Sequence, residues 1–171
     1  MDIKADLVQV LGAAMLQIYQ NIDSDKIKEA VDAHGLDHFI NICALEAGAG
    51  GAAAGLGGFA LAAASVPASL INTVVQQFRV TMAVIYAKRG TVKPSFTDFL
   101  AIVGMSLGVE IGVSIGSDVT GAIAAGILVE LGAAETGALV PIVGAAIVGG
   151  ANYAFIRAIG SALKRLQMSP A

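Results

Sequence analysis

Residues 47–78 read AGAGGAAAGLGGFALAAASVPASLINTVVQQF and carry no charged residue. As one straight helix this stretch would be about 48 Å long, well beyond the ~30 Å apolar core of a bilayer. The chain must therefore bend within it. Pro67 marks the bend, because the residue before a proline is pushed out of the helical region and proline itself suits the first position of a helix. We expect two helices, at about 47–65 and about 67–88, folded back as a hairpin.

Composition points to a chain with little polar surface. Hydrophobic residues make up 56% of the 171 residues and charged residues 13%, and there are 21 glycines. Ordinary domains contain about 45–50% apolar residues, glycine included, and about 25% charged residues. We expect lipid or other copies of the chain to cover part of such a surface. The length fits one domain over 1–171, with an acidic amphipathic part at 1–36 and an apolar Gly/Ala-rich core at 37–168.

Charge is distributed unevenly along the chain. Residues 1–46 hold eight acidic residues and three lysines, a net charge of −5 (3 − 8), whereas 136–171 hold three basic residues and no acidic one. No basic stripe is interleaved with aromatic residues, so we expect no nucleic-acid partner. A single cysteine, Cys43, excludes an intrachain disulfide and favours a reducing compartment. The acidic start of the chain is unlike the positive leader of a secretory signal, so we expect no such signal.

Apolar periodicity predicts an all-α fold, a compact bundle of Gly/Ala-rich helical hairpins preceded by amphipathic helices. Residues 5–19 place apolar side chains at helical spacing. Ser24 is positioned to cap a second helix that runs through Ala33, and Gly35 stops it. We expect a third helix to start near Asp37 and to continue into the Gly/Ala run.

The segment from Ala68 to Lys88 combines an apolar stripe with a polar face. The stripe consists of Ile71, Val74, Val75, Phe78, Met82 and Ile85. Asn72, Gln76 and Arg79 lie on another face, which we expect to meet water or a polar partner. The cations and glycine of 88–90 suit the end of this helix.

Glycines recur at four-residue steps in two places. The first pair is Gly51 and Gly55, and the second set is Gly104, Gly108, Gly112 and Gly116, on a helix that opens with the capping box of residues 95–98. Residues four apart share a helix face, so the second set is a glycine zipper, a pattern that lets another backbone approach closely. We expect these six glycines to be helix-packing positions, and Gly108→Leu or Gly112→Leu to impair folding or assembly by overpacking.

Two further features occupy the last third of the chain. Asp118 suits the cap of a helix over 119–131. Residues 136–156 form a second uncharged run that is long enough to span a bilayer, but Pro141 suits the start of a helix better than its interior. The chain has three tyrosines and no tryptophan, which favours peripheral or switchable membrane association over fixed spanning helices with aromatic belts.

The order of these features has a counterpart in a known family. It comprises the Gly-rich run, Pro67, the Gln76-Gln77 helix that ends in IYAKRG at 85–90, a polar break, and the terminal PIVGA segment at 141–145 followed by Asn152. Over about residues 40–165 this order resembles the EcsC-like proteins and the related hydrophobic helical domain attached to some bacterial GTPases. The resemblance implies a bacterial helical module, in the cytoplasm and associated with the inner membrane. It implies no catalytic residue.

Few side chains suggest chemistry. His34 and His38 are four apart, a spacing that binds zinc from one helix face with Asp37 or Glu46 as a further ligand, but the glycine between them favours a solvated helix start. Cys43 stands among apolar residues, which favours a small buried hydrophobe over a nucleophile. The glycines after Ala47 lack the following lysine of a phosphate-binding loop, so we expect no nucleotide site.

Charged residues in the apolar core allow two interpretations each. In a membrane, Glu110 and Asp118 would mark a proton or ion site, but we favour ordinary surface charges. Five basic residues either face anionic lipid or cap helix ends, and both interpretations stay open. These residues are Lys88, Arg89, Lys93, Lys164 and Arg165.

The sequence therefore predicts a non-enzymatic protein with no catalytic, cofactor or metal site. We expect it to bind or insert into a lipid bilayer and to form a homo-oligomer through its glycine-zipper helices. The alternative is a soluble homo-oligomeric scaffold in which other copies cover the apolar helix faces.

Overall fold

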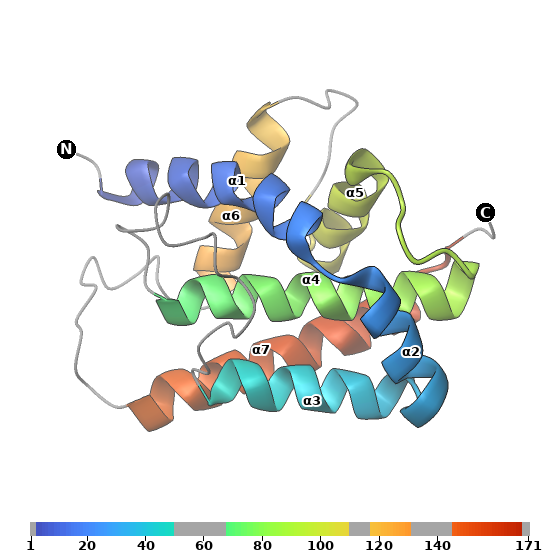
Figure 1. The fold of residues 1–171 in the computed structure, drawn as a ribbon. Helices are drawn as coiled ribbons and strands as arrows, with labels where there is room; N and C mark the ends of the chain where they lie inside the picture. Colours follow the sequence, from blue (N-terminus) through green and yellow to red (C-terminus); the bar gives the residue numbers. More distant parts are fainter. Residues whose placement is uncertain (1–2, 50–67, 110–116, 131–144, 169–171) are drawn as a thin grey trace.

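The computed structural model describes residues 3–49, 68–109, 117–130 and 145–168, and the regular structure within these ranges is entirely helical (Figure 1). The helices are α1 (Ile3–Asn21), α2 (Ser24–His34), α3 (Leu36–Gly48), α4 (Ala68–Arg89), α5 (Phe96–Ser106), α6 (Ser117–Glu130) and α7 (Ala145–Arg165). The all-α bundle predicted from apolar periodicity is confirmed.

Helix α4 is the centre of the fold. It lies between α1 and α5 on one side and α3 and α7 on the other (Figure 1). Every residue from Leu70 to Ile85 is buried except Arg79. The apolar stripe is therefore buried as predicted. Of the two alternatives for the polar face, the structure shows a polar partner rather than water, because Asn72 and Arg79 bond Glu46 of α3 while Asn72 is 2% and Gln76 4% exposed.

Helices α3, α4 and α7 form one layer in which α3 runs opposite to the other two. The C-terminal end of α3 meets the N-terminal half of α7 at Gly48 and Gly149, and its N-terminal end meets the last turn of α7. The amide of Asn72, near the start of α4, donates to the carbonyl of Glu46 at 2.9 Å. The ends of the three helices thus lie together at both ends of the layer, and the two ends of the layer differ in charge.

The contact between α3 and α7 depends on bare backbone at one point. A Cβ atom added at Gly48 would lie 2.9 Å from the carbonyl oxygen of Gly149, and one added at Gly149 would clash with the carbonyl of Gly48. Nearby, a Cβ at Gly160 would lie 2.8 Å from the Ile40 side chain. Small residues therefore do allow two backbones to approach closely, but at positions outside the predicted glycine sets.

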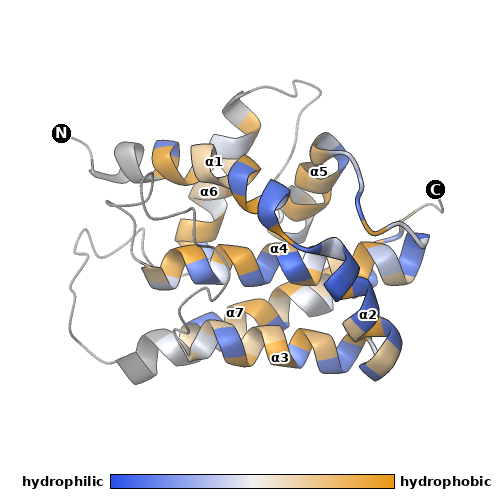
Figure 2. Cartoon of the chain, viewed as in Figure 1, coloured by the Kyte–Doolittle hydropathy of each residue, from blue (hydrophilic) through white to orange (hydrophobic). Residues whose placement is uncertain are grey.

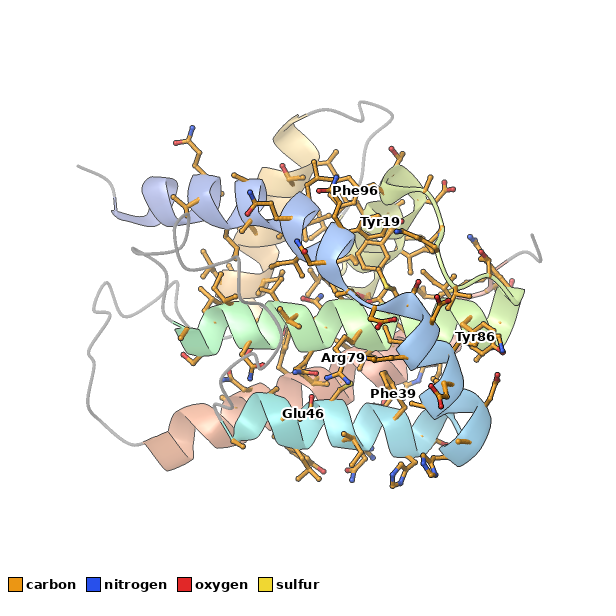
Figure 3. All side chains as sticks on the ribbon, in the orientation of Figure 1. Tyr19, Phe39, Glu46, Arg79, Tyr86 and Phe96 are labelled. Atoms are coloured by element: carbon orange, nitrogen blue, oxygen red, sulfur yellow. The ribbon has the colours of Figure 1, made fainter. Side chains whose placement is uncertain are left out.

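Aromatic rings connect α4 to the helices on its other side. Tyr19 of α1 lies 5.1 Å from Phe96 and 5.0 Å from Phe99, measured between ring centroids (Figure 3). Phe99 in turn meets Phe78 of α4 edge-on at 4.8 Å. The Tyr19 hydroxyl donates to the carbonyl of Pro94, so the buried ring keeps a hydrogen-bond partner.

Helix ends follow local signals, with one correction. The cap of α2 is Asp23 rather than Ser24, since the Asp23 carboxylate accepts from the Lys26 amide at 3.1 Å. Gly35 both ends α2 and begins α3, and its φ of 85° lies in the region that favours glycine. Ser95 caps α5 as predicted, accepting from the Asp98 amide at 3.2 Å.

The predicted glycine zipper is not one continuous helix. Helix α5 ends at Ser106, and Gly108 lies beyond it with φ 67° and no described atom within 4 Å of an added Cβ. Among the described residues, a side chain at Gly108 would meet backbone strain rather than a crowded neighbour, and the overpacking expected for Gly108→Leu stays a prediction. Gly104, by contrast, is buried within α5.

Several predicted features lie outside the described residues. These are Gly51, Gly55, Gly112, Gly116, Glu110, Pro67, Pro141 and most of the first hairpin helix at 47–65. The second hairpin helix, expected at about 67–88, agrees with α4, and the helix expected at 119–131 agrees with α6.

Neighbouring glycines of α7 provide a test of the α3–α7 contact. Gly149→Ala places a methyl group against the Gly48 carbonyl and should lower the free energy of unfolding by about 1–3 kcal/mol. Gly150→Ala, where an added Cβ meets no described atom within 4 Å, should be neutral or stabilising by up to about 1 kcal/mol. Equilibrium denaturation in urea measures both, and equal effects of the two substitutions would rule out the close contact.

Candidate functional site

A chain of polar side chains runs between α3 and α4. The Gln76 amide donates to the Asn72 side-chain oxygen at 3.1 Å, and Arg79 donates to the Gln76 oxygen at 2.7 Å. Arg79 also forms an ion pair with Glu46 of α3 (Figure 3). Its guanidinium lies 5.4 Å from the ring centre of Phe39. Each polar atom in this chain thus supports the next one, as in a satisfied buried network.

This polar chain fixes how α4 sits against α3. The side chain of Arg79 is 27% exposed and that of Glu46 45%, so their ion pair is partly shielded from water. If α4 slid along α3, the hydrogen bond from Asn72 and the ion pair of Arg79, both with Glu46, would break together. The arrangement positions helices, and no substrate-binding geometry is evident in it.

Gln77 follows Gln76 in sequence but differs from it in its hydrogen bonding. Its side chain is fully buried, and among the described residues neither its amide nitrogen nor its oxygen has a hydrogen-bond partner. Gln77 and Lys88 are eleven residues apart, which is three helical turns, so both lie on the side of α4 that faces α7. Thr81 on this side donates to the carbonyl of Gln77 at 2.8 Å and leaves the amide alone. An unpartnered buried amide costs stability, so it marks a weak point between α4 and α7.

The five basic residues of the sequence analysis differ in their surroundings. Lys88 caps a helix, but the helix is α7 rather than its own, since its ammonium donates to the carbonyls of Lys164 at 2.7 Å and Leu166 at 2.5 Å. Lys164 pairs with Asp37 at 2.6 Å. Lys93 and Arg165 are exposed, and Arg89 is half-buried. Two of the five basic residues are thus occupied within the fold.

Charged groups gather at the end of the layer where α4 and α7 finish. Lys28 and the Tyr86 hydroxyl both donate to Asp32, and these hydrogen bonds hold the pKa of the Asp32 carboxyl below its usual range. The hydrogen bond from Lys164 does the same for the pKa of Asp37. Figure 2 shows hydrophilic residues along α2 and at the C-terminal end of α4. We call this side the charged end.

Within the described residues, the opposite end of the same layer carries no charge beyond the Glu46–Arg79 ion pair at its edge. It comprises Gly48 and Ala49, residues 68–78 of α4 and 145–156 of α7, and we call it the uncharged end. Both uncharged runs of the sequence, 47–78 and 136–156, enter or leave the described structure here. No described helix is both long and apolar enough to cross a membrane.

The other candidate residues are placed as follows. Cys43 is fully buried, and this burial raises the pKa of its thiol to about 12, which makes it a packing residue rather than a nucleophile at neutral pH. His34 and His38 are exposed, with ring centres 5.4 Å apart. Within the described ranges, no group of three or more potential ligand side chains gathers for a metal ion. Asp118 lies in the first turn of α6.

Sequence reasoning missed the Arg79–Glu46 pair and the orphaned Gln77. The first joins residues that are 33 positions apart, and no local pattern links them. The second differs from Gln76 only in the helix that it faces.

Comparison of the chain with protein-family models, curated proteins and solved structures finds no match.

Adjacent glutamines provide a matched pair of substitutions. Gln77→Met removes two unpartnered buried atoms at similar volume and should raise the free energy of unfolding by about 1 kcal/mol or more. Gln76→Met removes one hydrogen bond each from Asn72 and Arg79 and should lower it by about 1–3 kcal/mol. Chemical denaturation of both variants measures the difference, and destabilisation by Gln77→Met would contradict the assignment.

Proposed function

We propose that this chain is a non-enzymatic helical protein that binds lipid membranes through the uncharged end of its α3–α4–α7 layer. The observation that supports this most directly is the separation of charge within one layer. Asp37, Lys88 and Lys164 are held at one end, while no charged residue lies in α4 before Arg79 or in α7 before Arg157. A body with one uncharged end suits a boundary between water and lipid.

The exposed residues near the uncharged end are suited to such a boundary. Ala49, Ala68, Ala151 and Ala154 are all exposed, and Leu45 of α3 is 51% exposed. None of these side chains holds a charge that would have to be stripped of water on contact with lipid. The membrane association implied by the EcsC-like resemblance agrees with this proposal.

We propose a non-enzymatic function because the thiol and the carboxylates named next are buried or held in ion pairs. The Cys43 thiol is buried and protonated at neutral pH, and Glu46 is paired with Arg79. Asp32 and Asp37 are each bound to a lysine at the charged end.

One observation favours the alternative of a soluble homo-oligomer. The exposed face of α7 carries several small residues around the exposed Arg157, and small residues are positions at which a second helix can pack closely. They are Gly150, Ala151, Ala154, Ala158 and Ser161. In this alternative, other copies rather than lipid cover the surface.

Two exposed alanines at opposite ends of α4 separate lipid binding from general effects of charge. Ala68→Glu puts a carboxylate at the uncharged end, and Ala87→Glu puts the same group at the charged end. Ala68→Glu should lower partitioning onto phosphatidylcholine vesicles by about fivefold or more, since removing a carboxylate from water costs more than ~1 kcal/mol. Ala87→Glu should bind as the wild type does.

Vesicle flotation measures the bound fraction, and size-exclusion chromatography with light scattering measures the mass of the unbound protein. Circular dichroism verifies that both variants are folded. Equal loss in the two variants would contradict binding through the uncharged end. A wild-type protein that forms a defined oligomer and never floats with vesicles would contradict the membrane proposal and support the alternative.

A further inference from the structure

The two histidines of the chain face each other across the junction of α2 and α3. His34 is the last residue of α2 and His38 lies in the first turn of α3, and both are exposed. Their ring centres are 5.4 Å apart, with the planes inclined at 50°. Gly35 interrupts the helix that would otherwise have carried both histidines on one face.

Backbone hydrogen bonds hold this junction in place. The Gly35 amide donates to the carbonyl of Val31 at 2.8 Å, and the Phe39 amide donates to the carbonyl of Gly35 at 3.1 Å. Val31 and Phe39 are themselves buried. The distance between the two imidazole rings is thus set by two packed helices rather than by a free loop.

This ring separation fits two imidazoles on one tetrahedral metal ion. With a Zn–N bond of about 2.0–2.1 Å, the ring centre of each histidine lies about 3.2 Å from the metal, and a tetrahedral angle then separates the two centres by about 5.2 Å. The last side-chain torsion of histidine is broad, so exposed rings are free to turn a nitrogen toward the point between them. Imidazole is a ligand that zinc, copper and nickel accept readily.

One chain supplies only half of such a site. Asp37, the carboxylate between the two histidines in sequence, pairs with Lys164 at 2.6 Å. No cluster of three ligand side chains occurs in the described part of the chain. A metal ion held by His34 and His38 would therefore keep two open positions, and both imidazoles stand on the surface where a second protein can reach them.

We propose that His34 and His38 form a half-site for Zn²⁺ or a similar divalent transition metal, completed by the same two residues of a second copy of this chain. Two copies related by a two-fold axis present two identical pairs, and four imidazoles satisfy the tetrahedral preference of zinc. The site lies on the α2–α3 junction, away from the small-residue face of α7, and it is independent of the membrane proposal.

Zinc titration of the purified full chain tests this site. Isothermal titration calorimetry should show one Zn²⁺ bound per two chains, and light scattering should show the mass doubling with Zn²⁺ and returning with EDTA. Mg²⁺, which prefers oxygen ligands, should do neither. His34→Ala and His38→Ala should each abolish the doubling of mass and weaken Zn²⁺ binding by about tenfold or more.

Asp37→Asn is the matched control, since it alters the same surface but keeps both imidazoles. It should bind Zn²⁺ and dimerise as the wild type does. Thermal melts followed by circular dichroism verify that the variants fold, as expected for exposed positions. Zinc binding that survives in the double His→Ala variant, binding lost in Asp37→Asn, or one Zn²⁺ per chain without a change of mass would each overturn the proposal.

Discussion

Burial of α4 on every side is the constraint on which the rest of the structure depends. Because residues 70–85 are almost entirely buried, each polar side chain of that segment either finds a hydrogen-bond partner inside the protein or stays buried without one. Asn72 and Arg79 find that partner in Glu46 of α3, and Gln76 bonds to both of them. The bonds to Glu46 thus fix the position of α3 against α4. The close contact between the backbones at Gly48 and Gly149 then places α7 against α3.

The same helix shows why the fold is polarised. The first half of α4 is uncharged and lies beside the uncharged parts of α3 and α7, while its last turn reaches across to cap α7 through Lys88. Charged residues therefore tie helix ends together mainly at one end of the layer, and toward the other end the described residues hold only the Glu46–Arg79 pair. Gln77 lies between these ends, on the side facing α7, and its missing hydrogen bonds make that contact weaker than an apolar one would be. In a protein that meets lipid, such a weakness lowers the cost of separating α4 from α7.

Local signals in the sequence predicted much of this fold. Sequence analysis predicted the bounds of α4, the end of α2 at Gly35 and the cap at Ser95, because each depends on residues within one helical turn. Contacts between distant segments were not readable. The glycine spacing through Gly108 implied a packing face only on the assumption that the helix continues, and α5 ends before it. The sequence indicates Glu46 only as a possible metal ligand, since nothing nearby in sequence reveals its partner 33 residues away.

An environment-sensitive dye attached at either end of α4 tests the central claim most directly. Ala68→Cys and Ala87→Cys each place an exposed thiol, whereas burial raises the pKa of the native Cys43 thiol to about 12, so at neutral pH the dye reacts at the introduced position. On addition of phosphatidylcholine vesicles, we predict a blue shift and a gain in fluorescence for the dye at 68 and no change for the dye at 87. No change at 68, or the same change at both positions, would contradict lipid binding through the uncharged end.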